Sequence, residues 1–146
     1  MRSLFSTVLA AALALAGVAH AQTTIGGCTI APKASCPKAQ LKQATIANMD
    51  LSGADLSGAN LQYARAAKTK FVGANLQRAD FDSADLSGSD FTNANLRGAN
   101  LNGATISGVN WSGADLSGAQ YPAGRDTSYN TPISRPCAEG SIGTCK

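Results

Sequence analysis

The sequence predicts a solenoid, a fold made by stacking coils of a repeated unit, and two periods support this prediction. From residue 39 to residue 123 an apolar residue stands at every fifth position through 17 quintets, and Ala66 is the only small one. A period of five fits neither an α-helix nor a flat strand, so it specifies a coiled repeat. These central positions are Leu41, Ile46, Leu51, Leu56, Leu61, Ala66, Phe71, Leu76, Phe81, Leu86, Phe91, Leu96, Leu101, Ile106, Trp111, Leu116 and Tyr121.

A longer period, four quintets in length, lies inside the shorter one. The residue two places before the centre is Ala in 13 of the 17 quintets. The four exceptions are Met49, Thr69, Ser89 and Val109, which recur at every twentieth position. The chain therefore returns to the same side after four quintets, which predicts a four-sided coil and about four coils in the block.

The N-terminal segment, 1–21, is predicted to be a secretory signal peptide and is excluded from the fold. Arg2 provides a positive start, residues 4–18 are apolar, and residues 19–21 match the small-x-small cleavage pattern. The apolar stretch has 15 residues, fewer than the roughly 20 that a membrane-spanning helix needs. Cleavage after Ala21 is expected to release a periplasmic or secreted chain that begins at Gln22, with no other segment able to cross a membrane.

The mature chain would carry little net charge. Its 125 residues include 11 Lys or Arg and 9 Asp or Glu, a net charge of +2, and the only histidine, His20, leaves with the signal peptide. This balance does not imply nucleic acid or an anionic surface as a partner. The length is that of one small domain.

Individual quintets carry a recognisable motif, seen in residues 54–58 (ADLSG), 74–76 (ANL) and 114–118 (ADLSG). They resemble the A(D/N)Lxx pattern of the pentapeptide-repeat family, and the resemblance covers 85 of the 125 mature residues. It implies an all-β fold, a right-handed quadrilateral β-helix in which each quintet forms one side and four quintets form one coil.

Each position of the quintet has an expected role in such a coil. The central residue and the small residue two places before it should point inward and stack on their equivalents in the next coil. Asp or Asn one place before the centre can bind local backbone groups. Gly two places after the centre suits a tight corner, where a positive φ is needed.

Stacking also predicts which charged residues become neighbours. Residues 20 apart should lie one coil apart, at a strand spacing of about 4.8 Å. Lys70 would then lie between Asp50 and Asp90, and Arg65 beside Asp85. Opposite charges on adjacent strands are favourable, so the irregular charges of the block are interpreted as pairs.

A functional alternative exists for the cations of this region. Arg65, Lys68, Lys70 and Arg78 are candidates for an anion-binding surface patch. Charge clusters are more often solvated faces of a fold, which is the competing interpretation.

The four cysteines lie outside the repeat block. Cys28 and Cys36 precede it, Cys137 and Cys145 follow it, and each pair has a spacing of eight. An even number of cysteines in an exported chain indicates disulfides. The ends of the solenoid would be roughly 20 Å apart, too far for a bridge between them unless the tail folds back, so pairing within each end is predicted. We expect an N-terminal cap at residues 22–38, the solenoid at 39–123 and a C-terminal cap at 124–146.

Catalysis is not predicted. The mature chain has no histidine and one glutamate, Glu139, so the usual bases and nucleophile activators are missing. Asp80 and Asp82 are the only carboxylate pair that could be nominated for glycoside chemistry, and Asp80 occupies a regular corner position. No cofactor or metal site is expected, because no dense ligand set exists.

Three functional hypotheses remain. The favoured one is an exported scaffold or protein-binding module of the cell envelope or extracellular space, monomeric and with an unidentified protein partner. The second comes from the resemblance, since some family members imitate DNA and bind gyrase through a rod of negative charge. Residues 39–123 carry 6 positive and 7 negative groups and follow an export signal, which disfavours this hypothesis. The third is an envelope polysaccharide hydrolase.

Overall fold

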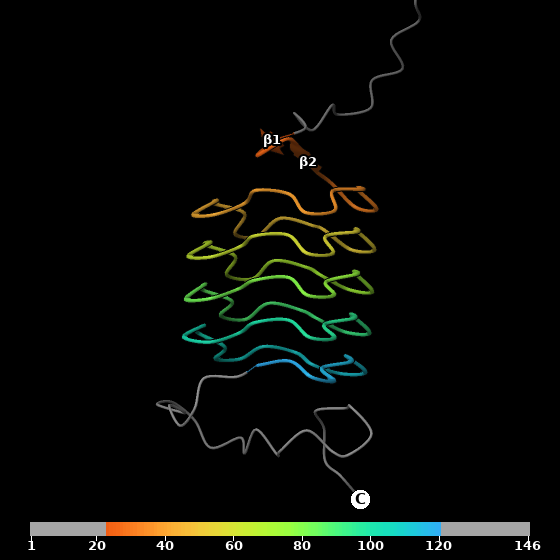
Figure 1. Ribbon diagram of the computed structural model, residues 1–146, viewed down its shortest axis with the longest axis vertical. Coiled ribbons are helices and arrows are strands. Elements are labelled where there is room, and N and C mark those ends of the chain that lie inside the picture. The colour runs from red at the N-terminus through yellow and green to blue at the C-terminus, as the bar shows by residue number, and fades with distance from the viewer. Residues whose placement is uncertain (1–22, 121–146) are drawn as a thin grey trace, which may run out of the picture.

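The structure is a computed structural model that describes residues 23–120. Figure 1 shows them as a stack of similar coils that runs from the N-terminal end, in orange, to the C-terminal end, in blue. The stack is a right-handed quadrilateral β-helix with four quintets in each coil, so the predicted fold class is confirmed. The expected signal peptide (1–21) and C-terminal cap (124–146) lie outside the described residues.

Neighbouring coils are joined in a single strict register. Parallel β-bridges link the residue one place before each centre to its equivalent 20 positions later, from Ser35 with Asp55 to Asn100 with Gln120. The N–H of Leu41 donates to the carbonyl oxygen of Asn60 at 2.8 Å, and the N–H of Asn60 donates back to that of Ala39 at 2.9 Å. The longer period of the sequence is therefore the length of one coil.

Each corner of the coil is a β-turn. At one of these corners, the N–H of Ala44 donates to the carbonyl oxygen of Leu41 at 3.0 Å, and Gln43 at the third position has a φ of +60°. A positive φ at that position alone is the pattern of a type II turn, which Gly adopts with least strain. The predicted positive φ is thus confirmed, but nine corners hold another residue: Lys33, Lys38, Gln43, Asn48, Tyr63, Lys68, Arg78, Ser83 and Asn93.

The interior is a continuous apolar core with an aromatic column through it. The ring of Phe91 stacks on Phe71 and on Trp111, with centroids 4.8 Å apart in both pairs. Phe81, from another side of the coil, meets Phe71 and Phe91 edge-on at 6.0 Å. The central residues and the Ala residues between them are buried through most of the stack, as predicted. The inward residues that are only partly buried lie toward the two ends of the stack: Ala34 and Met49 near the N-terminal end, and Ile106, Val109, Trp111 and Ala119 in the last described coil.

Two polar side chains lie in this core, at positions where Ala is the usual residue. Thr69 and Ser89 are fully buried. The Thr69 hydroxyl donates to the carbonyl oxygen of Ile46, and the Ser89 hydroxyl donates to that of Ala66, both at 2.7 Å. Burial without such a partner would cost stability, and these hydrogen bonds explain why the core accepts them.

A β-hairpin covers the N-terminal end of the stack. Strands β1 (Thr23–Ile25) and β2 (Cys28–Ile30) pair antiparallel, with Ile25 opposite Cys28. Gly26 and Gly27 form the two-residue loop with φ values of +54° and +78°, as a tight hairpin turn requires. Figure 1 shows the hairpin at the end of the stack, next to the first coil.

The coil begins earlier than the expected boundary at residue 39. Ser35 already bridges Asp55, the N–H of Cys36 donates to the carbonyl oxygen of Asp55 at 2.8 Å, and Lys33 and Lys38 occupy corners. Cys36 is the central residue of its quintet, and its buried side chain fills an inward position as the other centres do. The segment expected to be an irregular cap therefore contains regular coil.

A disulfide ties this first coil to the hairpin. Cys28 and Cys36 are bonded, with Cα atoms 5.3 Å apart, and both side chains are buried. The bridge spans the junction between β2 and the coil, so it fixes the hairpin on the end of the solenoid. The other expected pair, Cys137 and Cys145, lies outside the described residues.

Candidate interaction surface

Many Asp and Asn side chains on the outer surface of the solenoid bind the backbone of their own corner. In 11 quintets the Oδ1 atom of the Asp or Asn before the centre accepts a hydrogen bond from the N–H two residues later. At Asp50, for example, the donor is the N–H of Ser52 at 2.9 Å. The predicted backbone-binding role of these residues is confirmed, and it leaves the second oxygen of each Asp, or the amide nitrogen of each Asn, available to a neighbouring coil.

Asp80 illustrates how fully such a carboxylate is engaged. It accepts hydrogen bonds from the N–H of Asp82 at 3.1 Å, from Nε2 of Gln62 at 2.7 Å and from Nδ2 of Asn100 at 2.9 Å. Asp82 accepts one bond from the hydroxyl of Ser83 at 3.3 Å. The contacts of Asp80 tie its coil to the coils before and after it, so this member of the carboxylate pair nominated for catalysis has a structural role.

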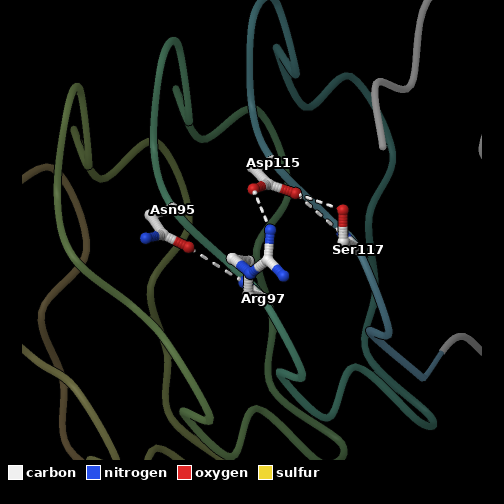
Figure 2. A network of polar contacts seen from close by, with 4 residues as sticks. All are labelled: Asn95, Arg97, Asp115 and Ser117. Carbon is white, nitrogen blue, oxygen red and sulfur yellow. Dashed lines mark hydrogen bonds and ion pairs between the residues drawn. The ribbon is translucent and has the colours of Figure 1, made fainter. Parts of the chain in front are cut away.

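Figure 2 shows the ion pair of the described chain, between Arg97 and Asp115. The Nη1 atom of Arg97 lies 3.3 Å from Oδ2 of Asp115, and the N–H of Arg97 donates to Oδ1 of Asn95 at 3.2 Å. The hydroxyl and N–H of Ser117 donate to Oδ1 of Asp115 at 2.6 and 3.0 Å. The Ser117 hydroxyl and N–H, and then Arg97, lower the pKa of Asp115.

The charge pairs predicted at Lys70 and Arg65 are neighbours but not ion pairs. The bridges do place Lys70 between Asp50 and Asp90 and Arg65 beside Asp85. Within residues 23–120, however, Arg97 and Asp115 are the only oppositely charged side chains whose nitrogen and oxygen atoms lie within 4.0 Å of each other. At Asp50, the Ser52 hydroxyl and N–H are the main causes of its lowered pKa, and Lys70 contributes less.

Lys70 and Arg65 form no ion pairs with the neighbouring aspartates because of the direction in which the carboxylates face. Because Oδ1 binds the N–H two residues ahead, the other oxygen is turned toward the residue one place after the centre of the preceding coil. Contacts along the stack therefore often span 18 positions, as in Gln62 with Asp80 and Arg97 with Asp115. A search of the sequence for opposite charges 18 positions apart would have predicted the ion pair of Arg97 and Asp115.

The four cations considered as an anion-binding patch do not share one face. Lys68 and Arg78 both occupy corners and are half a coil apart in the sequence, so they stand at opposite corners. Arg65 and Lys70 lie on the two sides that meet at the Lys68 corner. The coil groups Arg65, Lys68 and Lys70 and separates Arg78 from them.

Tyr63 is a surface feature that the sequence patterns did not single out. Among the described residues it is the one large hydrophobic side chain that is exposed, at 51%. It stands at a corner with a φ of +57°, and the Nζ atom of Lys42 lies 5.8 Å from its ring centroid. This is a cation–π distance. The register of the coil, which stacks Tyr63 between Gln43 and Ser83, could have indicated an outward aromatic ring.

Comparison with known proteins agrees with this geometry. The family model for pentapeptide repeats matches eight copies, over residues 34–72, 59–98 and 94–120. This chain belongs to the pentapeptide-repeat family. No curated protein matches the chain.

Solved pentapeptide-repeat structures resemble this one. A protein of the Arabidopsis thaliana thylakoid lumen is 36% identical with a TM-score of 0.51, over 51% of this chain and 52% of that one. A protein from Nostoc PCC 7120 is 32% identical with a TM-score of 0.53, over 60% of this chain and 77% of that one. This chain thus spans about half the length of the Arabidopsis protein.

Two further observations bear on the kind of site. Among residues 23–120, no group of three or more His, Cys, Asp or Glu side chains is placed to hold a metal ion. The same residues include no helix long and apolar enough to cross a membrane. The described surface of this family member consists of polar sides, one exposed aromatic ring and charged side chains.

Proposed function

We propose that this pentapeptide-repeat protein is an exported, non-enzymatic scaffold that binds another protein of the cell envelope or extracellular space. Its sides are flat ladders of Ser, Thr, Asn, Gln and Asp, the extended kind of surface that repeat solenoids use for binding. The Asp and Asn side chains are largely occupied by their own corners, which suits rigidity better than catalysis.

The observation that carries this proposal is the exposed ring of Tyr63. Tyr and Arg are over-represented among the residues that dominate binding energy at protein interfaces. Here Lys42 lies over the Tyr63 ring, and Arg65 follows two residues later on the adjoining side. An aromatic side chain that is 51% exposed at a corner between two polar sides is a natural anchor for a partner.

Capture from an envelope fraction tests this function. We expect the immobilised exported protein to retain one specific partner, and Tyr63→Ser to reduce its recovery about tenfold, within the range for an interface anchor. Ser is tolerated at this corner, because Ser83 occupies it one coil later. Gln43→Ser, at the same corner one coil earlier, is the matched control and should retain the partner. Equal recovery with both variants would remove Tyr63 as the anchor, and no specific partner at all would refute the binding function.

Export and the C-terminal cap are parts of the same proposal. We expect the intact mass of protein from the periplasm or medium to correspond to a chain that begins at Gln22. Non-reducing peptide mapping should show Cys137 bonded to Cys145, which would support residues 124–146 as a disulfide-closed cap. A mature protein that retains residues 1–21, or a bridge from Cys28 to Cys145, would contradict these expectations. Light scattering should give the mass of a monomer.

The gyrase-binding alternative is weaker for this chain. A DNA mimic needs an extended negative surface, whereas residues 23–120 carry eight Lys or Arg and seven Asp, a net charge of +1. We expect the exported protein to give gyrase no protection in a supercoiling assay. Protection at stoichiometric amounts would favour DNA mimicry over the scaffold proposal.

A further inference from the structure

The charges of the solenoid are segregated along its axis. Residues 23–78 contain seven Lys or Arg and two Asp, a net charge of +5. Residues 79–120 contain Arg97 and five Asp, a net charge of −4. Because four quintets make one coil, position in the sequence is position along the axis, at about 4.8 Å per coil. The small overall charge therefore conceals a basic N-terminal half and an acidic C-terminal half.

The basic half is positive all around rather than on one face. One of the four sides of the coil carries one of its seven cations, and each of the other three sides carries two. At the N-terminal end, residues 23–49 hold three lysines and no carboxylate. None of these seven cations lies within 4.0 Å of a carboxylate among residues 23–120. They are Lys33, Lys38, Lys42, Arg65, Lys68, Lys70 and Arg78.

Four of the cations occupy corners that would favour glycine. Lys33, Lys38, Lys68 and Arg78 have φ values between +56° and +59°, a region that costs most residues energy. The last five corners of the described chain, from Gly98 to Gly118, all hold glycine. The aliphatic stem of Lys33 instead lies over the glycine one coil later, Gly53, whose added Cβ would be 3.4 Å from its Cγ. The four cations accept this backbone strain, as the five uncharged corner residues Gln43, Asn48, Tyr63, Ser83 and Asn93 also do.

We propose that the N-terminal end of the solenoid docks end-on against a membrane surface rich in anionic phospholipid. A flat anionic surface at this end meets Lys33, Lys38 and Lys42, which lie on three sides of the first coil, whereas a linear polymer along one side would meet only one of these three. The acidic half begins about two coils away from the first coil, which carries Lys33, Lys38 and Lys42. This is a distance of roughly 10 Å, longer than the Debye length of about 8 Å at physiological salt. The inference goes beyond the proposed function, because it concerns how the scaffold is oriented.

Binding to vesicles tests this orientation. The exported protein should co-sediment with vesicles of equal parts phosphatidylglycerol and phosphatidylcholine, not with phosphatidylcholine alone, and salt should weaken the binding. Replacing Lys33, Lys38 and Lys42 together by Gln should weaken it about 100-fold, since each cation near such a surface contributes about a factor of five. Gln suits Lys33 and Lys38, because Gln43 holds an equivalent corner, and it suits Lys42, because Gln62 occupies the same position one coil later.

The matched control changes three charges in the acidic half. This variant replaces Asp80, Asp85 and Asp90 together by Asn. The hydrogen bond from the N–H two residues later should be kept, because Asn60, Asn75 and Asn95 accept it in the native protein. End-on docking predicts a change in vesicle affinity of less than about threefold, because these sites lie beyond the Debye length. Tyr63→Ser should also leave vesicle binding unchanged, which separates this inference from the proposed partner site.

Several results would overturn the proposal. They are equal binding to neutral vesicles, full binding by the triple Lys variant when circular dichroism shows it folded, and a large gain in affinity for the triple Asp variant. Tighter binding to soluble heparin than to the anionic vesicles would assign the basic half to a polymer instead of a membrane.

Discussion

The ring of Phe91 lies parallel to that of Phe71, one coil earlier, with centroids 4.8 Å apart and an interplanar angle of 20°. The separation is that of neighbouring coils, so the side-chain column has the same repeat as the backbone ladder. Trp111 continues the column on the other face of Phe91 at the same spacing. Phe91 is therefore the middle member of an aromatic stack that joins three coils.

Truncation of Phe91 should be the most damaging of the core substitutions. Phe91→Ala would leave a cavity between Phe71 and Trp111 and is expected to cost about 3 to 5 kcal/mol of unfolding free energy. Phe91→Leu should cost less, because Leu51 fills the equivalent position two coils earlier. Urea denaturation followed by circular dichroism measures both. Similar losses for the two variants would show that stacking, rather than filled volume, dominates.

Removal of the buried Ser89 hydroxyl should destabilise the protein even though it restores the usual residue of the repeat. Ser89→Ala removes the 2.7 Å hydrogen bond to the carbonyl oxygen of Ala66. We expect a loss of about 0.5 to 1.5 kcal/mol, since that carbonyl keeps a second bond from the N–H of Thr69. Thermal and urea unfolding measure the change. An increase in stability would mean that Ala packing outweighs the hydrogen bond.

The two glycines of the hairpin loop should respond differently to alanine. A Cβ added to Gly26 would lie 1.9 Å from the carbonyl oxygen of Gln40, a backbone atom that cannot rotate away. A Cβ on Gly27 would meet nothing within 4 Å, so only its φ of +78° is strained. We expect Gly27→Ala to cost about 1 kcal/mol.

Gly26→Ala, in contrast, should displace the hairpin from the first coil. Limited proteolysis, with cleavage sites located by mass spectrometry, should then show new cuts near residues 23–30. Equal protection of both variants would contradict the close contact between Gly26 and Gln40.

Acid should weaken the fold in part through Asp115. Its pKa is lowered below the usual 3.8 by the Ser117 hydroxyl and N–H and by Arg97. A group with a lower pKa in the folded state stabilises the protein above its unfolded pKa, and this contribution is lost as the pH falls from about 4 through the folded value. Asp115→Asn keeps the cap, as Asn95 does one coil earlier, and should flatten the pH dependence of the melting temperature below pH 4. An unchanged slope would place the acid sensitivity elsewhere, for instance at Asp50, whose pKa is also lowered.

Periodicity in the sequence was enough to predict the coil, its length and its stacking partners. Leu51, Phe71, Phe91 and Trp111 are equivalent because a periodic chain with one inward residue per side admits a single register. The same register correctly placed Lys70 between two aspartates. These results follow from local patterning, in which every quintet repeats the same requirement for a bulky centre, a small neighbour and a backbone-binding Asp or Asn.

The orientation of side chains on that frame emerged only in the folded structure. The carboxylates turn toward their own corners, so Lys70 forms no ion pair within 4.0 Å with a described residue, whereas Arg97 reaches Asp115 across a spacing of 18. Folding also placed Cys36 inside the first coil and set Lys68 and Arg78 at opposite corners. Such features depend on the direction of each side chain and on the closure of the coil, and a linear period carries neither.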